Sequence, residues 1–218
     1  MKIPSLLSLI ILTAIAFCSC SDEDYNDRAL LSEIVTATRN TPDGSEFQYR
    51  RYGDSPLITL TADGISVKEE YIGKRMLLRY YNESEIETSP RKIEIAALSP
   101  INNDTARIAD IDTISWSATP IYLNSMWRSG EHINIHLRVM YSDSPRLFNL
   151  TADSATIDTD TPQLYMCHDT FDAPDNYLFE TYASYDISNI WNRPTCKGID
   201  IHINDSNLHT DTYSFKKQ

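Results

Sequence analysis

The feature that most constrains the fold is a strict two-residue alternation of apolar and polar side chains. From residue 132 to 139, isoleucine, leucine or valine occupies every second position, and histidine, asparagine or arginine fills the positions between. Successive side chains of a β-strand point to opposite faces, so this pattern predicts a strand with one buried face. Residues 199–204 repeat the pattern with three isoleucines. Both segments therefore predict strands of a half-buried sheet.

Strands and turns account for the rest of the chain as well. Tyrosine, threonine and isoleucine are frequent, and Pro-Asp-Gly at 42–44 and Ala-Asp-Gly at 62–64 are typical turn sequences. A long stripe with the 3.6-residue period of a helix is missing from the sequence. An all-β protein is therefore predicted. The further predicted strands are 34–38, 46–52, 57–61, 75–81, 92–98, 163–167, 178–185 and 212–215.

The first residues have the pattern of an export signal. Lys2 precedes an apolar run from residue 6 to 17, and small residues lead into Cys20. A run of this length is well short of the roughly 20 residues that cross a bilayer. We expect cleavage before Cys20 and a diacylglycerol on its thiol; the alternative is an ordinary secretory signal, cut nearby to release a soluble protein.

The residues after Cys20 favour the lipoprotein interpretation. Ser21 to Asp24 resemble the acidic export tag that Bacteroidota-type lipoproteins carry after the lipidated cysteine. Cys18 competes as the acceptor, but the acidic residues do not follow it directly. The resemblance implies a signal peptide at 1–19, an acidic tether at 20–27, and an acylated (palmitate-type) anchor in the outer membrane that leaves the protein facing the cell exterior.

The charge argues against polyanionic partners. The whole chain carries a formal charge of -12, and loss of Lys2 with the signal makes it -13. Nucleic-acid binders need a clustered basic footprint, so no nucleic-acid partner is expected. A local basic patch stays open as an alternative, formed by Arg50, Arg51, Lys74, Arg75 and Arg79.

Metal and cofactor sites are not predicted. His132 and His136 share a strand face about 13 Å apart, too far for one metal ion. Asp153, Asp158 and Asp160 have calcium-like spacing but lack the glycine and closing glutamate of an EF-hand, so a solvated acidic loop is expected. Several aromatic residues could line a ligand groove, but we expect them to pack in the core. They are Tyr122, Trp127, Tyr165, Tyr182 and Trp191.

Two cysteines remain in the mature chain beside Cys20, at positions 167 and 196. An exported protein can form a disulfide, and closing this loop would contribute ~3.6 kcal/mol in the chain-entropy model. The alternative, slightly favoured, is that Cys167 and Cys196 are unpaired and buried. Their spacing provides neither a redox nor a zinc motif.

Catalysis is not expected either. The sequence has no Gly-x-Ser-x-Gly elbow. A site built from His168, Asp169 and Asp172 is the only enzymatic hypothesis, and it requires these side chains to meet in a pocket.

The whole pattern resembles the NigD-like lipoproteins. The N-terminal resemblance rests on the Asp-Gly turn at 63–64 and on segments 73–80 and 92–98; the C-terminal one rests on 127–130, 132–135, His168 and 182–187. The resemblance implies an OB-type β-barrel at 28–108 followed by a β-sandwich at 109–218. This chain departs from the family pattern at 132–135 and at 167–169.

The resemblance brings no catalytic residues. It implies a surface lipoprotein that binds a protein or glycan partner, with bacteriocin immunity as a special case; the alternative is an assembly subunit that offers a sheet edge to a neighbour in an envelope complex. Three triplets also resemble the O-glycosylation signal of exported Bacteroidota proteins. Their acceptors would be Thr105, Thr113 and Ser154, and Thr113 would fit an exposed interdomain linker.

Overall fold

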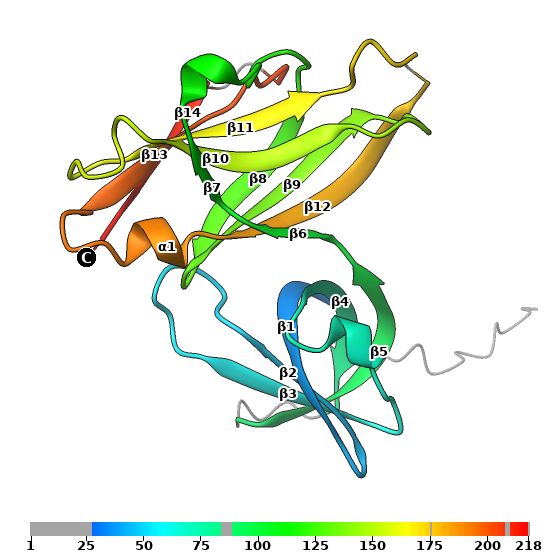
Figure 1. Ribbon diagram of the computed structural model, residues 1–218. Helices are drawn as coiled ribbons and strands as arrows, with labels where there is room; N and C mark the ends of the chain where they lie inside the picture. Colours follow the sequence, from blue (N-terminus) through cyan, green and yellow to red (C-terminus); the bar gives the residue numbers. More distant parts are fainter. Residues whose placement is uncertain (1–27, 84–88, 175, 208–209, 218) are drawn as a thin grey trace, which may run out of the picture.

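The computed structural model describes residues 28–83, 89–174, 176–207 and 210–217. Cys20, the signal and the tether lie outside these residues. The chain forms two β domains, one above the other in Figure 1. This confirms the predicted fold class. Within the described residues, no helix has the length and apolar character needed to cross a membrane.

The first domain is a closed five-stranded barrel with the strand order β1-β2-β3-β5-β4. Only β3 and β5 pair in parallel; the other neighbours are antiparallel. Apolar side chains that alternate along the strands, such as Phe47, Leu60 and Leu78, fill the barrel and are fully buried. The elements are β1 (Leu31–Thr41), β2 (Gly44–Tyr49), β3 (Ile58–Asp63), the 3-10 turn η1 (Glu69–Tyr71), β4 (Arg75–Asn82) and β5 (Arg91–Pro100).

The second domain is a sandwich of two sheets. One sheet has the order β14-β13-β11-β10-β7 and the other β6-β12-β9-β8. Its elements are β6 (Asn102–Thr105), β7 (Arg107–Ala109), η2 (Ile111–Thr113), β8 (Tyr122–Ser129), β9 (His132–Met140), β10 (Leu147–Asp153), β11 (Gln163–Asp169), β12 (Leu178–Asp186), the short helix α1 (Ser188–Trp191), β13 (Gly198–His202) and β14 (Thr212–Lys216).

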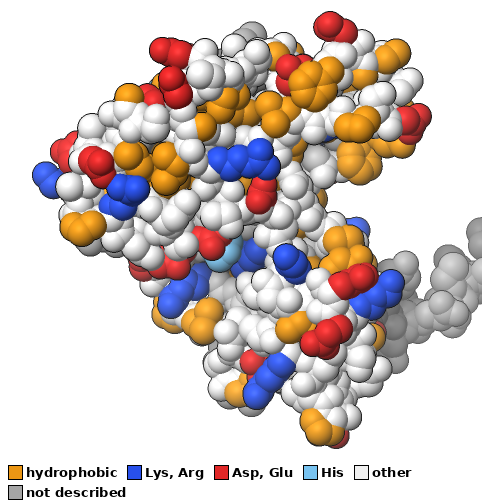
Figure 2. Space-filling view, viewed as in Figure 1, with side chains coloured by type: hydrophobic (Ala, Val, Ile, Leu, Met, Phe, Trp, Pro, Cys, Tyr) orange, Lys and Arg blue, Asp and Glu red, His pale blue; other side chains and the backbone are white. Residues whose placement is uncertain are grey.

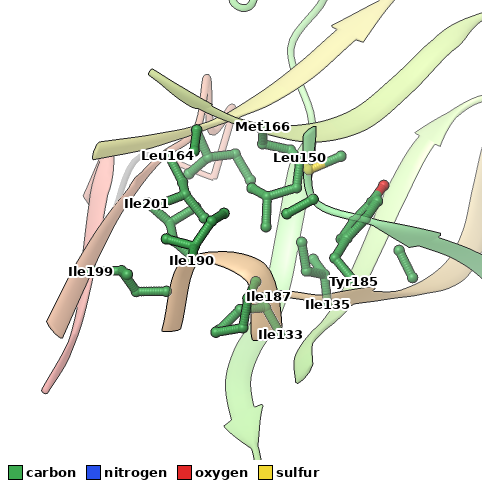
Figure 3. Packing of buried hydrophobic residues seen from close by; sticks show 14 of the residues in the cluster. Ile133, Ile135, Leu150, Leu164, Met166, Tyr185, Ile187, Ile190, Ile199 and Ile201 are labelled. Atoms are coloured by element: carbon green, nitrogen blue, oxygen red, sulfur yellow. The ribbon is translucent and has the colours of Figure 1, made fainter. Parts of the chain in front are cut away.

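The alternating isoleucines supply the core between the two sheets (Figure 3). Ile133 and Ile135 of β9 face Leu150 of β10, and Ile201 of β13 packs in the same cluster; all four are fully buried. Burying such side chains contributes roughly 1.5–3 kcal/mol each. The period-two pattern of the sequence therefore corresponds directly to the packed faces of both sheets.

The connection between the domains is a single residue. β5 ends at Pro100, β6 begins at Asn102, and β6 pairs in parallel with β12 of the sandwich. The sandwich thus begins at about residue 102, earlier than the predicted 108/109 boundary, because β6 and β7 take their partners from its two sheets. Thr113 lies in η2, after β7, so it is exposed within the sandwich domain and not in an interdomain linker.

The β8–β9 turn holds the barrel and sandwich together. Gly53 N donates to Arg128 O and Gly130 N donates to Gly53 O, each at 2.7 Å. Arg128 also donates through both terminal nitrogens to the Asp54 carboxylate, at 2.9 and 2.6 Å, and its guanidinium lies 4.4 Å from the centre of the Trp191 ring. Gly130 adopts a φ of 60°, which favours glycine. These contacts fix how the domains meet.

Cys167 and Cys196 are both free and buried. Cys167 lies on β11, where its thiol contacts the Thr151 hydroxyl, and Cys196 precedes β13. The disulfide alternative is therefore not what the structure shows. Burial raises the pKa of the Cys167 thiol, which keeps it protonated and unreactive.

Candidate functional site

A groove opens at one end of the sandwich, where the core between the sheets reaches solvent. The inward faces of β9, β10 and β12 continue past the buried isoleucines and end in aromatic side chains. The groove has a volume of about 400 Å³, within the range of ligand sites. We call it the aromatic groove; it is lined by Asn102, Val139, Tyr141, Ser142, Arg146, Phe148, Phe179 and Thr181.

The groove opens because the neighbouring strands stop early. β6 pairs with β12 only at 183–186, and β7 pairs with β10 only at 151–153. Among the described residues, no strand therefore covers the outer edge of β12 at 178–182 or of β10 at 147–150. Unpaired N–H and C=O groups along such an edge can accept another strand. The aromatic groove thus lies between two free sheet edges.

Exposed hydrophobic side chains form the rim. Tyr177, Leu178 and Phe179 are 57%, 54% and 46% exposed. Tyr177 stacks on Tyr141 with ring centres 5.1 Å apart, and Tyr141 N donates to Tyr177 O. Hydrophobic side chains gather over this end of the sandwich in Figure 2. Contiguous exposed apolar surface of this kind marks interaction sites more often than chance.

Polar groups also line the groove: an amide, two hydroxyls and a guanidinium, from Asn102, Ser142, Thr181 and Arg146. Arg146 has a terminal nitrogen, Nη1, that is buried and has no hydrogen-bond partner within the described part of the chain. The Tyr141 hydroxyl donates to Asp143 at 2.7 Å, and this carboxylate raises the pKa of Tyr141. The groove thus combines aromatic rings with amide and hydroxyl groups and with one cation that can still donate, a composition suited to binding.

The three residues of the enzymatic hypothesis do not meet. His168 is fully buried, with its ring edge-on to Phe148 and its Nδ1 at 3.1 Å from Thr119 O. Asp169 follows it on β11 and points to the opposite face, because successive strand residues alternate. Asp172 lies in an exposed turn with a φ of 57°. The geometry overturns this hypothesis: His168 is a core residue behind the groove.

Burial of His168 predicts a loss of stability at acid pH. Desolvation lowers the pKa of His168, so the folded state keeps the ring neutral while the unfolded state protonates it near pH 6.5. Stability is therefore full above the unfolded pKa and falls as the pH drops through it, by at most about 1.4 kcal/mol per pH unit for this group. Urea unfolding at pH 7.5 and 5.0 should show a smaller drop for His168→Gln than for wild type. An equal drop would contradict this account.

The remaining residues singled out from the sequence lie apart. His136 contacts Glu180 at 2.5 Å on the outer sheet face, while His132 lies near the domain junction. Asp158 pairs with Arg193 and Asp160 with Lys197. Among the described residues, no three His, Cys, Asp or Glu side chains gather to hold a metal. The predicted glycosylation acceptors Thr105, Thr113 and Ser154 are all exposed.

The aromatic residues named from the sequence are not those of the groove. Tyr182 stacks on His136, Tyr165 stacks on His202, and Trp191 is buried beside Arg128. Tyr141, Phe148 and Phe179 line the groove instead. The sequence signal for Phe179 was the apolar cluster at 177–179, where β12 begins before its edge is covered.

Comparisons with known proteins show which solved structures have a similar fold. A protein of unknown function from Bacteroides vulgatus matches with a TM-score of 0.66 at 14% identity, covering 87% of this chain and 92% of that one. A candidate lipoprotein from Bacteroides fragilis matches with a TM-score of 0.62 at 13% identity, covering 87% of this chain and 98% of that one. A NigD-like immunity protein from Bacteroides caccae matches with a TM-score of 0.55 at 17% identity, covering 86% of this chain and 92% of that one. None of the curated protein sequences matches significantly.

A match to a family model shows which protein family the chain belongs to. The model of the NigD-like C-terminal beta sandwich domain matches residues 104–217, more than half of the chain. Its start agrees with the sheet topology, since β6 already belongs to the sandwich. The sandwich that forms the aromatic groove is thus the domain that the family model matches, and the chain belongs to the NigD-like family.

Proposed function

We propose that this protein is a non-catalytic lipoprotein, anchored through Cys20 to the outer membrane and facing the cell exterior, that binds a protein partner in the aromatic groove. The anchor is supported by the sequence before and after Cys20 and by the structural similarity to a candidate lipoprotein. Immunity to a bacteriocin is the special case suggested by the similar NigD-like immunity protein.

The observation that carries the proposal is the composition of the groove and its rim. Aromatic rings and arginine are enriched at the centres of protein interfaces, where they contribute most of the binding energy. Tyr177 and Phe179 are about half exposed, and Phe179 lines the groove together with Arg146, whose Nη1 has no partner among the described residues. The exposed rim side chains Leu178 and Phe179 carry no hydrogen-bonding group, which suits the apolar side chains of a protein better than the hydroxyl groups of a sugar. A protein partner is therefore favoured over a glycan.

The second candidate function, an assembly subunit of an envelope complex, is supported by the free edge of β12. Residues 178–182 pair with β9 on one side, and on the other side no strand of the described residues pairs with them. A strand from a neighbouring subunit could continue the sheet there and place alternate side chains in the groove. Both functions use the same surface, but only assembly requires main-chain pairing.

Capture from intact cells tests the proposal. The double variant Tyr177→Ser/Phe179→Ser should recover the partner at least about tenfold less well than wild type, since truncated hot-spot rings cost ~2 kcal/mol or more. Both rings are exposed, so the fold should be unchanged, which circular dichroism checks.

Phe171→Ser is the matched control, because this ring is 66% exposed but lies outside the groove. It should bind as wild type does. Equal recovery by the double variant, or enrichment of carbohydrate in place of protein, would contradict the proposed function.

A further inference from the structure

A second cavity lies between the two domains and contains a buried arginine that pairs with no carboxylate of the described residues. This interdomain cleft has a volume of about 530 Å³ and takes its lining from both domains, with Thr36, Gln48 and Arg75 from the barrel and Ser129, His132 and Asn192 from the sandwich. Figure 2 shows a hollow at the waist of the molecule, where basic and acidic side chains gather around a histidine.

Arg75 is 5% exposed, and its contacts are all neutral oxygens. Its Nε donates to Ser184 Oγ at 3.2 Å, Nη1 to Thr36 Oγ1 at 3.3 Å and Nη2 to Asn134 Oδ1 at 3.1 Å. A guanidinium has five N–H groups, so each terminal nitrogen retains one without a partner within the described residues. Buried charges normally have a counter-charge, and burial alone lowers the pKa of Arg75 to about 10.

A second group beside Arg75 also has unused donors. Asn134 is fully buried, and its Oδ1 already accepts from Arg75 and from Ser184 Oγ at 2.8 Å. Its Nδ2 has no partner within the described residues. The oxygen must face these two donors, which fixes the amide orientation and leaves its N–H groups unsatisfied. Donors without acceptors therefore accumulate at one point of the domain junction.

The charges around the cleft agree with this excess of donors. Asp54 is neutralised by Arg128, and Glu131 accepts from Asn192 at 2.6 Å. The lining then contains two arginines, Arg50 and Arg75, and one acid without a cationic partner among the described residues, Glu131. His132 stays neutral because burial and the charge of Arg75 lower its pKa. In contrast to the acidic chain as a whole, the cleft favours an anion.

We infer that the interdomain cleft is a binding site for an oxyanion, a carboxylate or a sulfate or phosphate group, held by the free N–H groups of Arg75. The planar guanidinium matches the oxygens of such groups, and the hydrogen bonds gain strength in a partly dehydrated site. The ligand's remaining bulk occupies the open part of the cleft. This site is separate from the aromatic groove and does not depend on the function proposed for it.

Titration calorimetry on the mature full-length chain tests the site with three probes: glucuronate, sulfate and phosphate, at constant ionic strength set by chloride. Glucuronate binding assigns a carboxylate ligand, and sulfate or phosphate binding assigns a tetrahedral one. Arg75→Gln should weaken the affinity about tenfold to hundredfold, the factor for losing a hydrogen bond to a charged group. Arg79→Gln, an exposed arginine of the same strand, should leave it unchanged.

A spectroscopic measurement on the wild type covers the case in which Arg75→Gln fails to fold. The Arg75 Nε–H cross-peak in a ¹⁵N NMR spectrum should shift with the probe and not with chloride. Tyr177→Ser/Phe179→Ser should retain the anion response, which separates this site from the aromatic groove. No binding of any probe, or an equal response to chloride, overturns the inference.

Discussion

Gly44→Ala should destabilise the barrel more than any other single-methyl addition at a described glycine. An added Cβ would lie 1.9 Å from Ala62 O, 2.8 Å from Ala62 C and 2.9 Å from Asp63 Cα. All three are backbone atoms of β3, which pairs with β2 at this position, so no side chain can turn away. We expect a loss of about 3 kcal/mol, at the upper end for overpacking. In thermal unfolding this corresponds to roughly 6–12 °C for a chain of this size.

Gly64→Ala is the control in the same hairpin region. Its added Cβ would meet nothing within 4 Å, but the backbone φ of 69° disfavours alanine. This strain costs roughly 1–2 kcal/mol. The three tryptophans lie at 116, 127 and 191, all in the sandwich, so circular dichroism should report the loss in Gly44→Ala more strongly than tryptophan fluorescence. Equal stability of the two variants would show that β2 and β3 do not approach as described.

Cys20→Ala should abolish lipid attachment completely. Cells labelled with an alkyne analogue of palmitate should show a labelled wild-type protein and an unlabelled variant, because the acyl chains depend on this thiol or on processing at it. Several chains on one cysteine give a stable anchor, and no basic patch is needed to support it. We therefore expect the variant to lose the acyl anchor together with the label.

Cys18→Ala is the matched control, since Cys18 is the competing acceptor two residues earlier. This variant should keep the wild-type label and the wild-type membrane fraction. A labelled Cys20→Ala protein, or an unlabelled Cys18→Ala protein, would move the acceptor to Cys18. Both proteins unlabelled would leave the acceptor unassigned.

The strands that the sequence predicts well are those with one buried face. β9 and β13 alternate apolar and polar residues along their length, and burial against the opposite sheet leaves only one register for them. The five barrel strands were also predicted. β10 has the same alternation in Phe148, Leu150 and Ala152, with Asn149 and Thr151 between, but the run is too short to predict a strand.

Three other strands could not be predicted, two of them because their partners are distant in the sequence. β6 reads Asn-Asn-Asp-Thr, a turn by composition, yet it pairs with β12 about 80 residues later, and Asn102 donates to the Tyr185 hydroxyl. β7 has three residues and depends on β10. β8 contains a register shift between Leu123 and Ser125 that breaks its alternation. Tertiary pairing, not local propensity, makes these segments strands.

The candidate sites are harder to predict from the sequence than the strands are. One site depends on where two strands end, and the other on which hydrogen-bond donors have no acceptor. The aromatic groove exists because β6 and β7 end before covering β12 and β10. The interdomain cleft depends on which neutral groups surround Arg75, and these come from β1, β9 and β12. The sequence gives the positions of apolar and charged residues, but it does not show which of their side chains remain without partners in the fold.

Site-specific photocrosslinking in living cells tests the central claim most directly, namely that the aromatic groove receives a protein partner at the cell exterior. A photoreactive amino acid at position 179, on the rim, should give a crosslinked protein adduct that external protease removes from intact cells. The same amino acid at position 65, an exposed site on the barrel, should give none. An equal pattern of adducts at both positions, or no protein adduct at position 179, would contradict the account.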